Sequence, residues 1–553
     1  MRVFLAILIL FIYLMLTGCN SCNRNNRSEE RKERLSENPD SSFIVNFILQ
    51  NPQFAPYQKK INDFYRKRKF LLAWSENGEF VPQADMFVNV VEQAEDYGVD
   101  IDSALASLRD SMLFLKDAPY PLNNRLLLLQ KNIDITLTAG FFLLAPKLLQ
   151  GMVDPQAEDN IQWHIEPKKI MYSQLLDSIL YGQTSFNPFL NYKHLHPQVN
   201  ELKKILVKYR AIEQKGGWGS IENNGQNLSP GDSGSRVLQL ARRLFITNDI
   251  AYFDSTRSVL NSDLTEGVKK FQRRHGLSAS GIADSLTLRY LNIPVDDKIR
   301  QILVNMERWR WVPGPLAGNY ILVNIPDFRL TIYRNSNPVE SMKIIVGKTG
   351  SNTVIFQGDI KYVVLNPYWN IPESIAVKEI LPQIKKDTVY LREHQIEVGF
   401  KWNFNALNQD TINWGNITSD NFNYTLRQKP GNKNPLGRIK FLFPNQFSIY
   451  LHDTPNFRLF NENDRGFSHG CIRVERPIDL ADYLLGSDAL KKRRQIYNLL
   501  ISGRNESITL DTPVPVYILY FTVWADRNGI PQFRKDVYEH DRKLAKRLFQ
   551  PDV

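Results

Sequence analysis

Hydrophobic and polar positions divide the chain into a helical first part and a strand-rich last part. From about residue 43 to residue 210, apolar residues recur at helical spacing, most clearly over 126–149. Gly151, Pro155, Pro188 and Pro197 break this region into segments. No group of residues in it resembles a catalytic site. We therefore predict a helical scaffold domain over residues 43–215.

A second, smaller helical unit follows a linker. The glycine-rich run Gly216-Gly217-Trp218-Gly219 and the run Asn223-Asn224-Gly225 are typical of a connection between domains. After them, two stretches place apolar residues on one helical face: Val237, Leu240, Ala241 and Leu244 in the first, and Val268 and Phe271 in the second. This pattern predicts a compact helical domain at 226–292. The order of its elements resembles the three-helix peptidoglycan-binding module of bacterial wall enzymes.

From Asn319 onward the pattern becomes that of β-strands. Residues 320–325 and 330–333 are rich in β-forming residues and flank Pro326-Asp327-Phe328, as in a hairpin. Further strands are predicted at 341–346, 361–365, 439–443, 447–451 and 514–524. We expect a mostly β, sandwich-like domain over 318–524, followed by a C-terminal extension at 525–553.

A long insertion interrupts this β domain at about 366–437. It contains a short helical stretch at 375–381 and three tryptophans, Trp369, Trp402 and Trp414. Aromatic side chains on a long connection suggest a flap that covers a site.

The N-terminus has the pattern of an export signal. Met1-Arg2 precedes an apolar run over 3–16, which is shorter than the about 20 residues of a membrane span. The run ends in Leu16-Thr17-Gly18-Cys19, which resembles a bacterial lipoprotein signal. We expect residues 1–18 to be removed, Cys19 to be lipidated and residues 19–42 to form a flexible tether. An uncleaved anchor helix is the alternative.

Either reading places the protein in the periplasm, attached to a membrane through its N-terminus. Two or more acyl chains on Cys19 would make that attachment stable. Asn20 stands where an acidic residue is the usual signal for retention in the inner membrane, so Asn20 favours the outer membrane.

Composition and charge narrow the class of protein. The chain has 553 residues, 43% of them hydrophobic and 23% charged, as in an ordinary globular protein of several domains. Its 69 basic and 58 acidic residues give a net charge of +11, which suits an anionic partner. The basic residues are scattered and no groove-reading or base-stacking motif accompanies them, so we expect no nucleic-acid partner.

The three cysteines differ in setting. Cys19 and Cys22 lie in the predicted tether, whereas Cys471 is the one cysteine of the folded body. Exported proteins tend to pair their cysteines, so an unpaired thiol is either an inert core residue or a reactive one. Taken alone, this count favours the inert reading.

The candidate chemistry lies in two nearby runs, Tyr450-Leu451-His452-Asp453-Thr454 and Phe467-Ser468-His469-Gly470-Cys471-Ile472-Arg473-Val474. A cysteine nucleophile needs a base and amide donors for the developing oxyanion. His452 would be the base, and Gly470 would allow a tight turn that presents amides. Arg473 would lower the thiol pKa or hold a substrate carboxylate.

Two alternatives remain open on the residues alone. The side chains of His452, Asp453, His469 and Cys471 are all possible zinc ligands, although no paired Cys-x-x-Cys or His-x-x-x-His spacing supports a metal site. A buried thiol beside two hydrogen-bonded histidines is the other alternative.

The run from His452 to Val474 resembles the signature of the YkuD-type L,D-transpeptidases, in which a histidine is followed after a spacer by Ser-His-Gly-Cys and an arginine or asparagine. Residues 430–441 match the segment before that signature, and Asn366-Pro367-Tyr368-Trp369-Asn370 resembles the start of a substrate-capping insertion. The order of scaffold, peptidoglycan-binding module and catalytic domain resembles the YcbB-like branch. One departure is Gly350-Ser351-Asn352-Thr353-Val354, where the family often has a Thr-Pro pair.

The resemblance implies roles for particular residues. It makes Cys471 the nucleophile and His452 the general base and acid, with the backbone carbonyl of Asp453 orienting the imidazole. It places His469 and Gly470 at the oxyanion hole and pocket. Substrate contacts are implied for Arg473, Tyr450, Ser468 and Trp369.

The implied reaction is a peptidoglycan transpeptidation that forms 3→3 cross-links through a thioester and uses no metal or organic cofactor. The expected partners are peptidoglycan stem peptides and glycan, and we expect a monomer. A hydrolase with the same centre, either an L,D-carboxypeptidase or an enzyme that releases a protein from the wall, is the main alternative. A non-catalytic wall-binding lipoprotein is another.

Overall fold

The computed structural model describes residues 38–549 except 77, 120–121, 157–161, 183–194, 257, 315, 317, 402–403 and 487–488. The described residues form two compact units, one from residues up to Met152 and Lys168–Leu195, the other from Val153–Pro167 and His196–Val553. The predictions for the signal peptide, Cys19 and Cys22 fall outside the described residues.

The first unit is helical. Its helices are α2 (Ser41–Gln50), α3 (Gln58–Lys67), α4 (Pro82–Glu92), α5 (Ser103–Ala106), α6 (Leu108–Lys116), α7 (Asn124–Leu149) and α8 (Tyr172–Leu180). Side chains that accept from backbone amides begin three of them, namely Asp40 at α2, Asp102 at α5 and Asn123 at α7.

Helix α7 is the central helix of this unit. It is apolar and long enough to cross a membrane, yet much of it is buried against α3, α4 and α6. Its buried Asp134 accepts hydrogen bonds from the Tyr65 hydroxyl at 2.6 Å and the Trp74 amide at 2.7 Å. Burial raises the pKa of Asp134 to about 6. A carboxylate satisfied in this way by its own domain fits a core helix.

The second unit contains the three-helix module that the sequence predicts. Its helices are α10 (Ser235–Ile246), α11 (Ser262–Arg274) and α12 (Ser285–Leu291). Val237, Leu240, Val268 and Phe271, which were assigned to one face of each helix, are fully buried in a shared core. The helical region, the three-helix module and the mostly β domain therefore follow one another in the predicted order.

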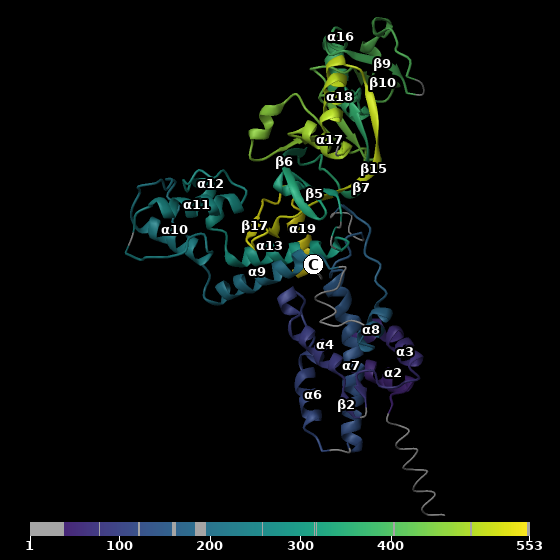
Figure 1. The fold of residues 1–553 in the computed structure, drawn as a ribbon, viewed down its shortest axis with the longest axis vertical. Coiled ribbons are helices and arrows are strands. Elements are labelled where there is room, and N and C mark those ends of the chain that lie inside the picture. Colours follow the sequence, from purple (N-terminus) through teal and green to yellow (C-terminus); the bar gives the residue numbers. More distant parts are fainter. Residues whose placement is uncertain are drawn as a thin grey trace, which may run out of the picture. The chain divides into compact units, whose positions relative to one another are not determined.

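Two long helices join this module to the β domain. Helix α9 (Pro197–Gln214) lies beside α13 (Val295–Trp311), as Figure 1 shows. We predicted α9 as the end of the scaffold, but its contacts place it in the second unit. No helix was predicted for α13. It packs through Ile299, Ile302 and Met306, which are buried at helical spacing.

The β domain is built on one large sheet. Its strands are β3 (Trp163–His164), β4 (Tyr320–Asn324), β5 (Arg329–Arg334), β6 (Asn337–Gly347), β7 (Ile355–Leu365), β11 (Ile439–Leu442), β12 (Leu451–His452), β13 (Gly466–Ser468), β14 (Ile472–Val474) and β15 (Glu506–Leu519). The order is β11-β12-β14-β6-β5-β4-β15-β7-β3, and β11 also pairs with β7, so the sheet closes on itself. The predicted hairpin is present as the antiparallel pair β4 and β5.

The insertion forms a small subdomain with its own core, which we call the cap. It contains the three-stranded sheet β8 (Trp369–Asn370), β10 (Tyr424–Gln428) and β9 (Ile396–Phe400). The predicted helical stretch is present as α14 (Glu373–Ile375), a π-helical turn η4 (Ala376–Ile380) and α15 (Leu381–Lys386), followed by α16 (Tyr390–Glu393). Trp414 is buried in the cap core and Trp369 packs against it. Trp402 lies outside the described residues.

The C-terminal extension returns to the body of the second unit. The strands β16 (Val523–Ala525) and β17 (Pro531–Phe533) form a hairpin, and α19 (His540–Phe549) packs on α13. The Arg308 guanidinium of α13 is buried and pairs with Asp541 of α19. Helices α17 (Pro477–Leu485) and α18 (Ala489–Ser502) cover β15 and β7.

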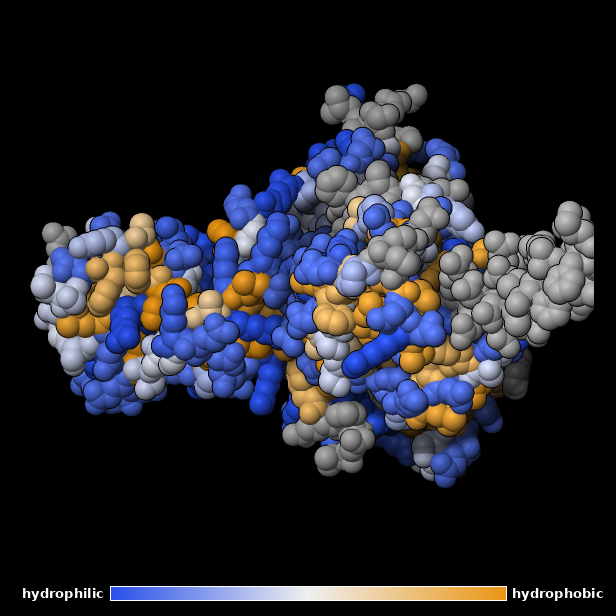
Figure 2. All heavy atoms as spheres, turned by 90° about the horizontal axis from the view of Figure 1, so that it is seen from below, coloured by the Kyte–Doolittle hydropathy of each residue, from blue (hydrophilic) through white to orange (hydrophobic). Residues whose placement is uncertain are grey.

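On the face drawn in Figure 2, hydrophilic side chains separate smaller hydrophobic patches. Single large apolar side chains of the first unit are exposed, among them Leu49, Phe114 and Met171. Scattered exposure of this kind is normal for a folded protein surface.

Candidate active site

Pairing between β12 and β14 brings the two candidate runs together. The strands are parallel, with His452 opposite Arg473 and Leu451 opposite Ile472. The Ile472 amide donates to the Tyr450 carbonyl at 3.1 Å, which sets Tyr450 level with Cys471. Because side chains alternate along a strand, Tyr450, His452, Cys471 and Arg473 share one face of the pair. Leu451 and Ile472 are buried on the other face.

The imidazole of His452 is held in one orientation. It is buried, and its Nδ1 lies 2.5 Å from the Asp453 carbonyl oxygen. Nδ1 therefore carries the proton and donates it, which leaves Nε2 as the basic nitrogen. Burial, followed by the positive charge of Arg473, lowers the pKa of His452 to about 3. The imidazole is thus neutral at physiological pH, as a general base must be.

Asp453 is fixed in turn by the residues around it. Its carboxylate accepts from the Arg438 amide at 2.8 Å and the Thr454 amide at 2.7 Å. Gly437, with a φ of +59°, allows the chain to pass close by, since a Cβ there would lie 2.5 Å from the Asp453 carboxyl group. This close packing holds the carbonyl that orients His452.

The Cys471 thiol is half-buried and protonated at rest. Its Sγ lies 3.7 Å from the Ser448 carbonyl oxygen. Burial raises the pKa of the Cys471 thiol, while hydrogen bonds from Tyr450 and the charges of Lys440 and Arg473 oppose the rise. A neutral thiol on the same face as a neutral imidazole fits proton transfer during attack, without a preformed ion pair.

A side-chain staple shapes the turn that carries the thiol. The Ser468 hydroxyl donates to the Cys471 carbonyl at 2.5 Å and accepts from the Gly470 amide at 3.1 Å. Gly470 has a φ of +117°, a conformation that only glycine adopts readily. The Gly470 amide therefore donates to the Ser468 hydroxyl in this structure, and its oxyanion role stays a prediction. The neighbouring Cys471 amide is a second candidate donor.

Arg473 is poised for an anionic group. Its guanidinium is half-buried, and its buried Nε has no hydrogen-bond partner within the described part of the chain. A buried donor without a partner is costly, so a carboxylate placed there would be bound favourably.

His469 and Trp369 both have contacts in the cap. The His469 Nε2 is 2.8 Å from Glu379 Oε1 in the cap turn η4. Trp369 packs against the cap core. For the zinc alternative, the described residues contain no group of three or more His, Cys, Asp or Glu side chains placed to hold a metal ion.

Three residues around the Cys471 turn were not predicted as site residues from the sequence. Lys440 lies opposite His452 on β11, with its Nζ 3.8 Å from the centre of the Tyr450 ring. The Thr353 hydroxyl donates to the Gly470 carbonyl at 2.8 Å. Tyr538 of the C-terminal extension donates to the Gly347 carbonyl at 2.6 Å and accepts from the Thr353 amide at 3.3 Å. For Lys440 a signal existed, because it alternates with the buried Ile439 and Phe441.

Comparison with known families agrees with this geometry. Residues 318–516 match the family described as "L,D-transpeptidase catalytic domain" (YkuD), residues 59–206 match "Scaffold domain", and residues 234–291 match "Putative peptidoglycan binding domain". A curated protein of Haemophilus influenzae named "Putative L,D-transpeptidase" is 33% identical over 245 residues. That match covers 44% of this chain and 49% of the relative, so the chain spans about half of that protein's length.

Solved L,D-transpeptidases give weaker likenesses. The enzyme from Stackebrandtia nassauensis is 13% identical, with 54% of this chain and 96% of that chain covered at a TM-score of 0.21. The enzyme from Xylanimonas cellulosilytica is also 13% identical, with 53% and 98% covered at a TM-score of 0.17. TM-scores this low do not support any statement about this chain. From the family matches, residues 318–516 are an L,D-transpeptidase catalytic domain of the YkuD family, in a chain that also carries a scaffold domain and a peptidoglycan-binding domain.

Proposed function

We propose that this protein is a peptidoglycan L,D-transpeptidase that forms 3→3 cross-links through a thioester on Cys471. The observation that carries the proposal is the register of β12 and β14, which puts Tyr450, His452, Cys471 and Arg473 on one face. A neutral base, a thiol and a guanidinium whose Nε has no hydrogen-bond partner among the described residues are groups that suit acyl transfer at an anionic peptide.

In the first half-reaction, Cys471 Sγ attacks the stem-peptide carbonyl between the L-centre of a diamino acid and a terminal D-residue. His452 Nε2 accepts the thiol proton as the carbon–sulfur bond forms. The carbon–nitrogen bond then breaks, and the same proton goes to the leaving D-alanine amine. The Cys471 amide stabilises the oxyanion and Arg473 holds a donor carboxylate.

In the second half-reaction, the side-chain amine of another stem attacks the thioester. His452 takes a proton from that amine and returns it to sulfur as the carbon–sulfur bond breaks. The cap would exclude water so that the amine is favoured over hydrolysis. The reaction as written needs no metal or organic cofactor.

The test is replacement of Cys471 by Ala. With a tetrapeptide donor, the wild-type chain should gain the mass of the acyl group, and Cys471→Ala should gain none in intact-protein mass spectrometry. A covalent adduct of unchanged yield on Cys471→Ala would refute the assignment. Products separate the main alternative: cross-linked dimers indicate a transpeptidase, whereas trimmed monomers indicate a carboxypeptidase.

We also propose that the chain is exported and held on the periplasmic side of a membrane by lipid on Cys19, with the outer membrane favoured. This rests on the N-terminal sequence pattern alone. The mass of the mature N-terminal peptide tests it, since it should begin at Cys19 and carry acyl chains. An intact residue 1–18 segment would point to an anchor helix instead.

A further inference from the structure

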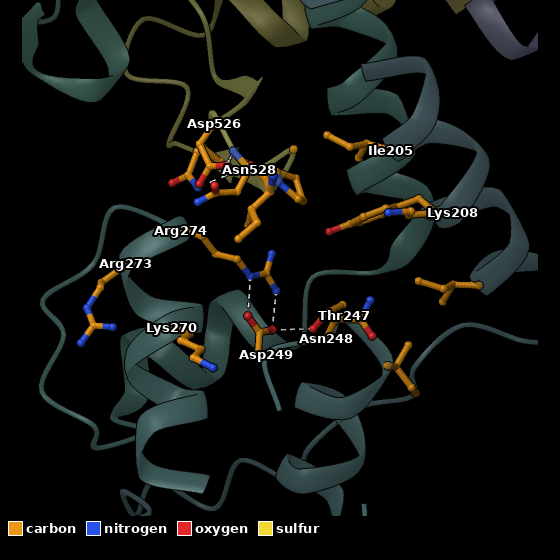
Figure 3. A pocket seen from close by; sticks show the side chains of 17 residues that line it. Ile205, Lys208, Thr247, Asn248, Asp249, Lys270, Arg273, Arg274, Asp526 and Asn528 are labelled. Atoms are coloured by element: carbon orange, nitrogen blue, oxygen red, sulfur yellow. Dashed lines mark hydrogen bonds and ion pairs between the residues drawn. The ribbon is translucent and has the colours of Figure 1, made fainter. Parts of the chain in front are cut away.

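A cavity of about 470 Å³ lies where α9, the three-helix module and the turn between β16 and β17 meet. Figure 3 shows Lys208 and Ile205 entering from α9, Arg274 and Lys270 from α11, and Asp526 and Asn528 from the turn. A volume in this range accommodates a small ligand or a few residues of a peptide. Nothing derived above for Cys471 uses this cavity.

The two acidic side chains in the cavity wall are already satisfied. Both Asp249 oxygens accept from Arg274 at 2.7 Å, and Thr247 also donates to that carboxylate. The Asp526 carboxylate accepts from the Asn528 and Ile530 amides and from the Gln532 side chain. Neither acid is available to a cation in the cavity.

The basic side chains, in contrast, exceed the acids. At the rim, Lys208 and Lys270 are exposed, and Lys270 lies near one acidic side chain, that of Glu266. Arg274 in the lining and Arg243 and Lys298 behind it are buried, as is the Asp249 carboxylate that Arg274 pairs with. Burial, followed by repulsion from Arg274, lowers the pKa of Lys298 to about 7. The cavity therefore has a positive potential that an anion would neutralise.

The rest of the lining suits a peptide. Ile205, Ile212 and Ile246 supply an aliphatic surface, and Asn248, Asn528 and Gln532 supply amide donors and acceptors. Together with the basic rim, this combination matches a short chain of small residues that ends in carboxylates. Phosphate alone would leave the aliphatic surface uncovered.

We infer that this cavity binds a carboxylate-bearing stem peptide of peptidoglycan, so that the chain holds its polymer at a second site apart from Cys471. The inference rests on the proposed function for the choice of ligand. The three-helix module supplies one wall of the cavity, and α9 and the C-terminal extension supply the others. Binding at this site therefore requires the assembled second unit.

The experiment measures binding of a soluble disaccharide-tetrapeptide to the full chain by calorimetry. Lys208→Glu combined with Lys270→Glu should weaken the affinity roughly tenfold, as expected for two lost charge contacts. The matched control, Lys215→Glu with Arg242→Glu, makes the same change of net charge on α10 and just beyond α9, away from the cavity, and should leave the affinity within about twofold. A probe with amidated carboxylates should bind the wild type as weakly as it binds the rim variant.

Three results would overturn the inference: unchanged affinity in the rim variant, equal loss in both charge variants, or full affinity for the amidated probe. Acylation of Cys471 by a short donor peptide serves as the second readout. It should stay within about twofold in the rim variant, because neither lysine contacts the catalytic centre. If Cys471 of the wild type were not acylated at all, the proposed function itself would be wrong. The two failures are therefore distinguishable.

Discussion

At the scale of single residues, the centre depends on a balance between burial and positive charge around one thiol. Burial favours the protonated form of Cys471, while Lys440 and Arg473 favour the thiolate. Lys440 is the less expected of the two, since it comes from the neighbouring strand β11, where it lies opposite His452 and close to the Tyr450 ring.

Replacing Lys440 by Met should move the pH profile of Cys471 alkylation to higher pH. The thiolate is the reactive form, and removal of a nearby positive charge raises the thiol pKa. We expect the rate of Cys471 alkylation by iodoacetamide at pH 8 to fall roughly three- to tenfold. Peptide mapping at Cys471 measures this rate. Lys361→Met, on the exposed side of β7, is the control and should not shift the profile. An identical profile for Lys440→Met would show that this charge does not act on the thiol.

Much of this centre could be predicted from the sequence because its signal is local. The spacing of His452 and Ser468-His469-Gly470-Cys471 lies within one short segment and carries a family resemblance. Lys440, Thr353 and Tyr538 could not be found in the same way, because strand pairing and the chain end bring them there. The hydrogen bond from the Gly470 amide to the Ser468 hydroxyl could not be predicted either, because residue spacing does not reveal where a side-chain hydroxyl points.

At the scale of elements, an ion pair between Glu379 of the cap and His469 joins the cap to the turn that carries Cys471. Glu379 in η4 reaches His469, and both side chains are about half exposed, at 53% and 42%. A contact so exposed contributes at most about 1 kcal/mol. That is enough to change how often the cap lies open, yet too little to unfold it.

Glu379→Gln should therefore increase hydrolysis relative to cross-linking by about two- to fivefold, because water reaches the thioester more often. The ratio of trimmed monomers to cross-linked dimers in a muropeptide digest measures this. The control is Glu373→Gln, which removes a similarly exposed pair with Lys401 inside the cap. If both variants give the wild-type ratio, this contact does not govern the cap.

Most strands followed from the alternation of apolar residues, but their lengths did not. Strand β6 starts before its predicted range because its first residues pair with β5 in a hairpin, and β15 starts earlier because residues 506–509 pair with β7, which is far away in sequence. Of the strand predicted at 447–451, only Leu451 is in a strand, β12. The short strand β3, from residues 153–167, was not predicted. Its two residues pair with β7, and two residues are too few to show a periodic pattern. Helix α13 was not predicted, because the charged residues Glu307, Arg308 and Arg310 interrupt its apolar face.

At the scale of the whole molecule, the predicted order of scaffold, peptidoglycan-binding module and catalytic domain agrees with the family matches. The exact boundaries stay predictions. Length and composition predicted several domains. The change from a helical to a strand period in the hydrophobic pattern separated the helical part of the chain from the β domain. The grouping of α9 with the second unit depends on tertiary contacts and was beyond the sequence pattern.

The buried histidines should make the second unit sensitive to acid. His540 of α19 is buried, neither ring nitrogen has a hydrogen-bond partner in the described residues, and burial lowers its pKa to about 3. An imidazole with a lowered folded pKa binds its proton more readily when unfolded. The contribution of the buried, neutral imidazole to the free energy of unfolding is complete above about pH 6.5. It is lost as the pH falls toward 3.

His540→Phe should therefore lose less stability than the wild type between pH 6.5 and pH 5, by about 2 kcal/mol. Urea unfolding at both pH values measures the difference. The control is Phe422→Leu in the cap, which changes a buried ring, removes no imidazole and should keep the wild-type acid sensitivity. Equal acid sensitivity in His540→Phe and the wild type would mean that this site does not resist protonation.

The link from Tyr538 through Thr353 to Gly470 has a consequence for the effects of substitutions. Tyr538 lies far from Cys471 in the sequence, yet it helps to fix the turn that presents the thiol. A change at Tyr538 should therefore reach the thiol through that turn. A mutational survey confined to the residues around Cys471 would overlook it.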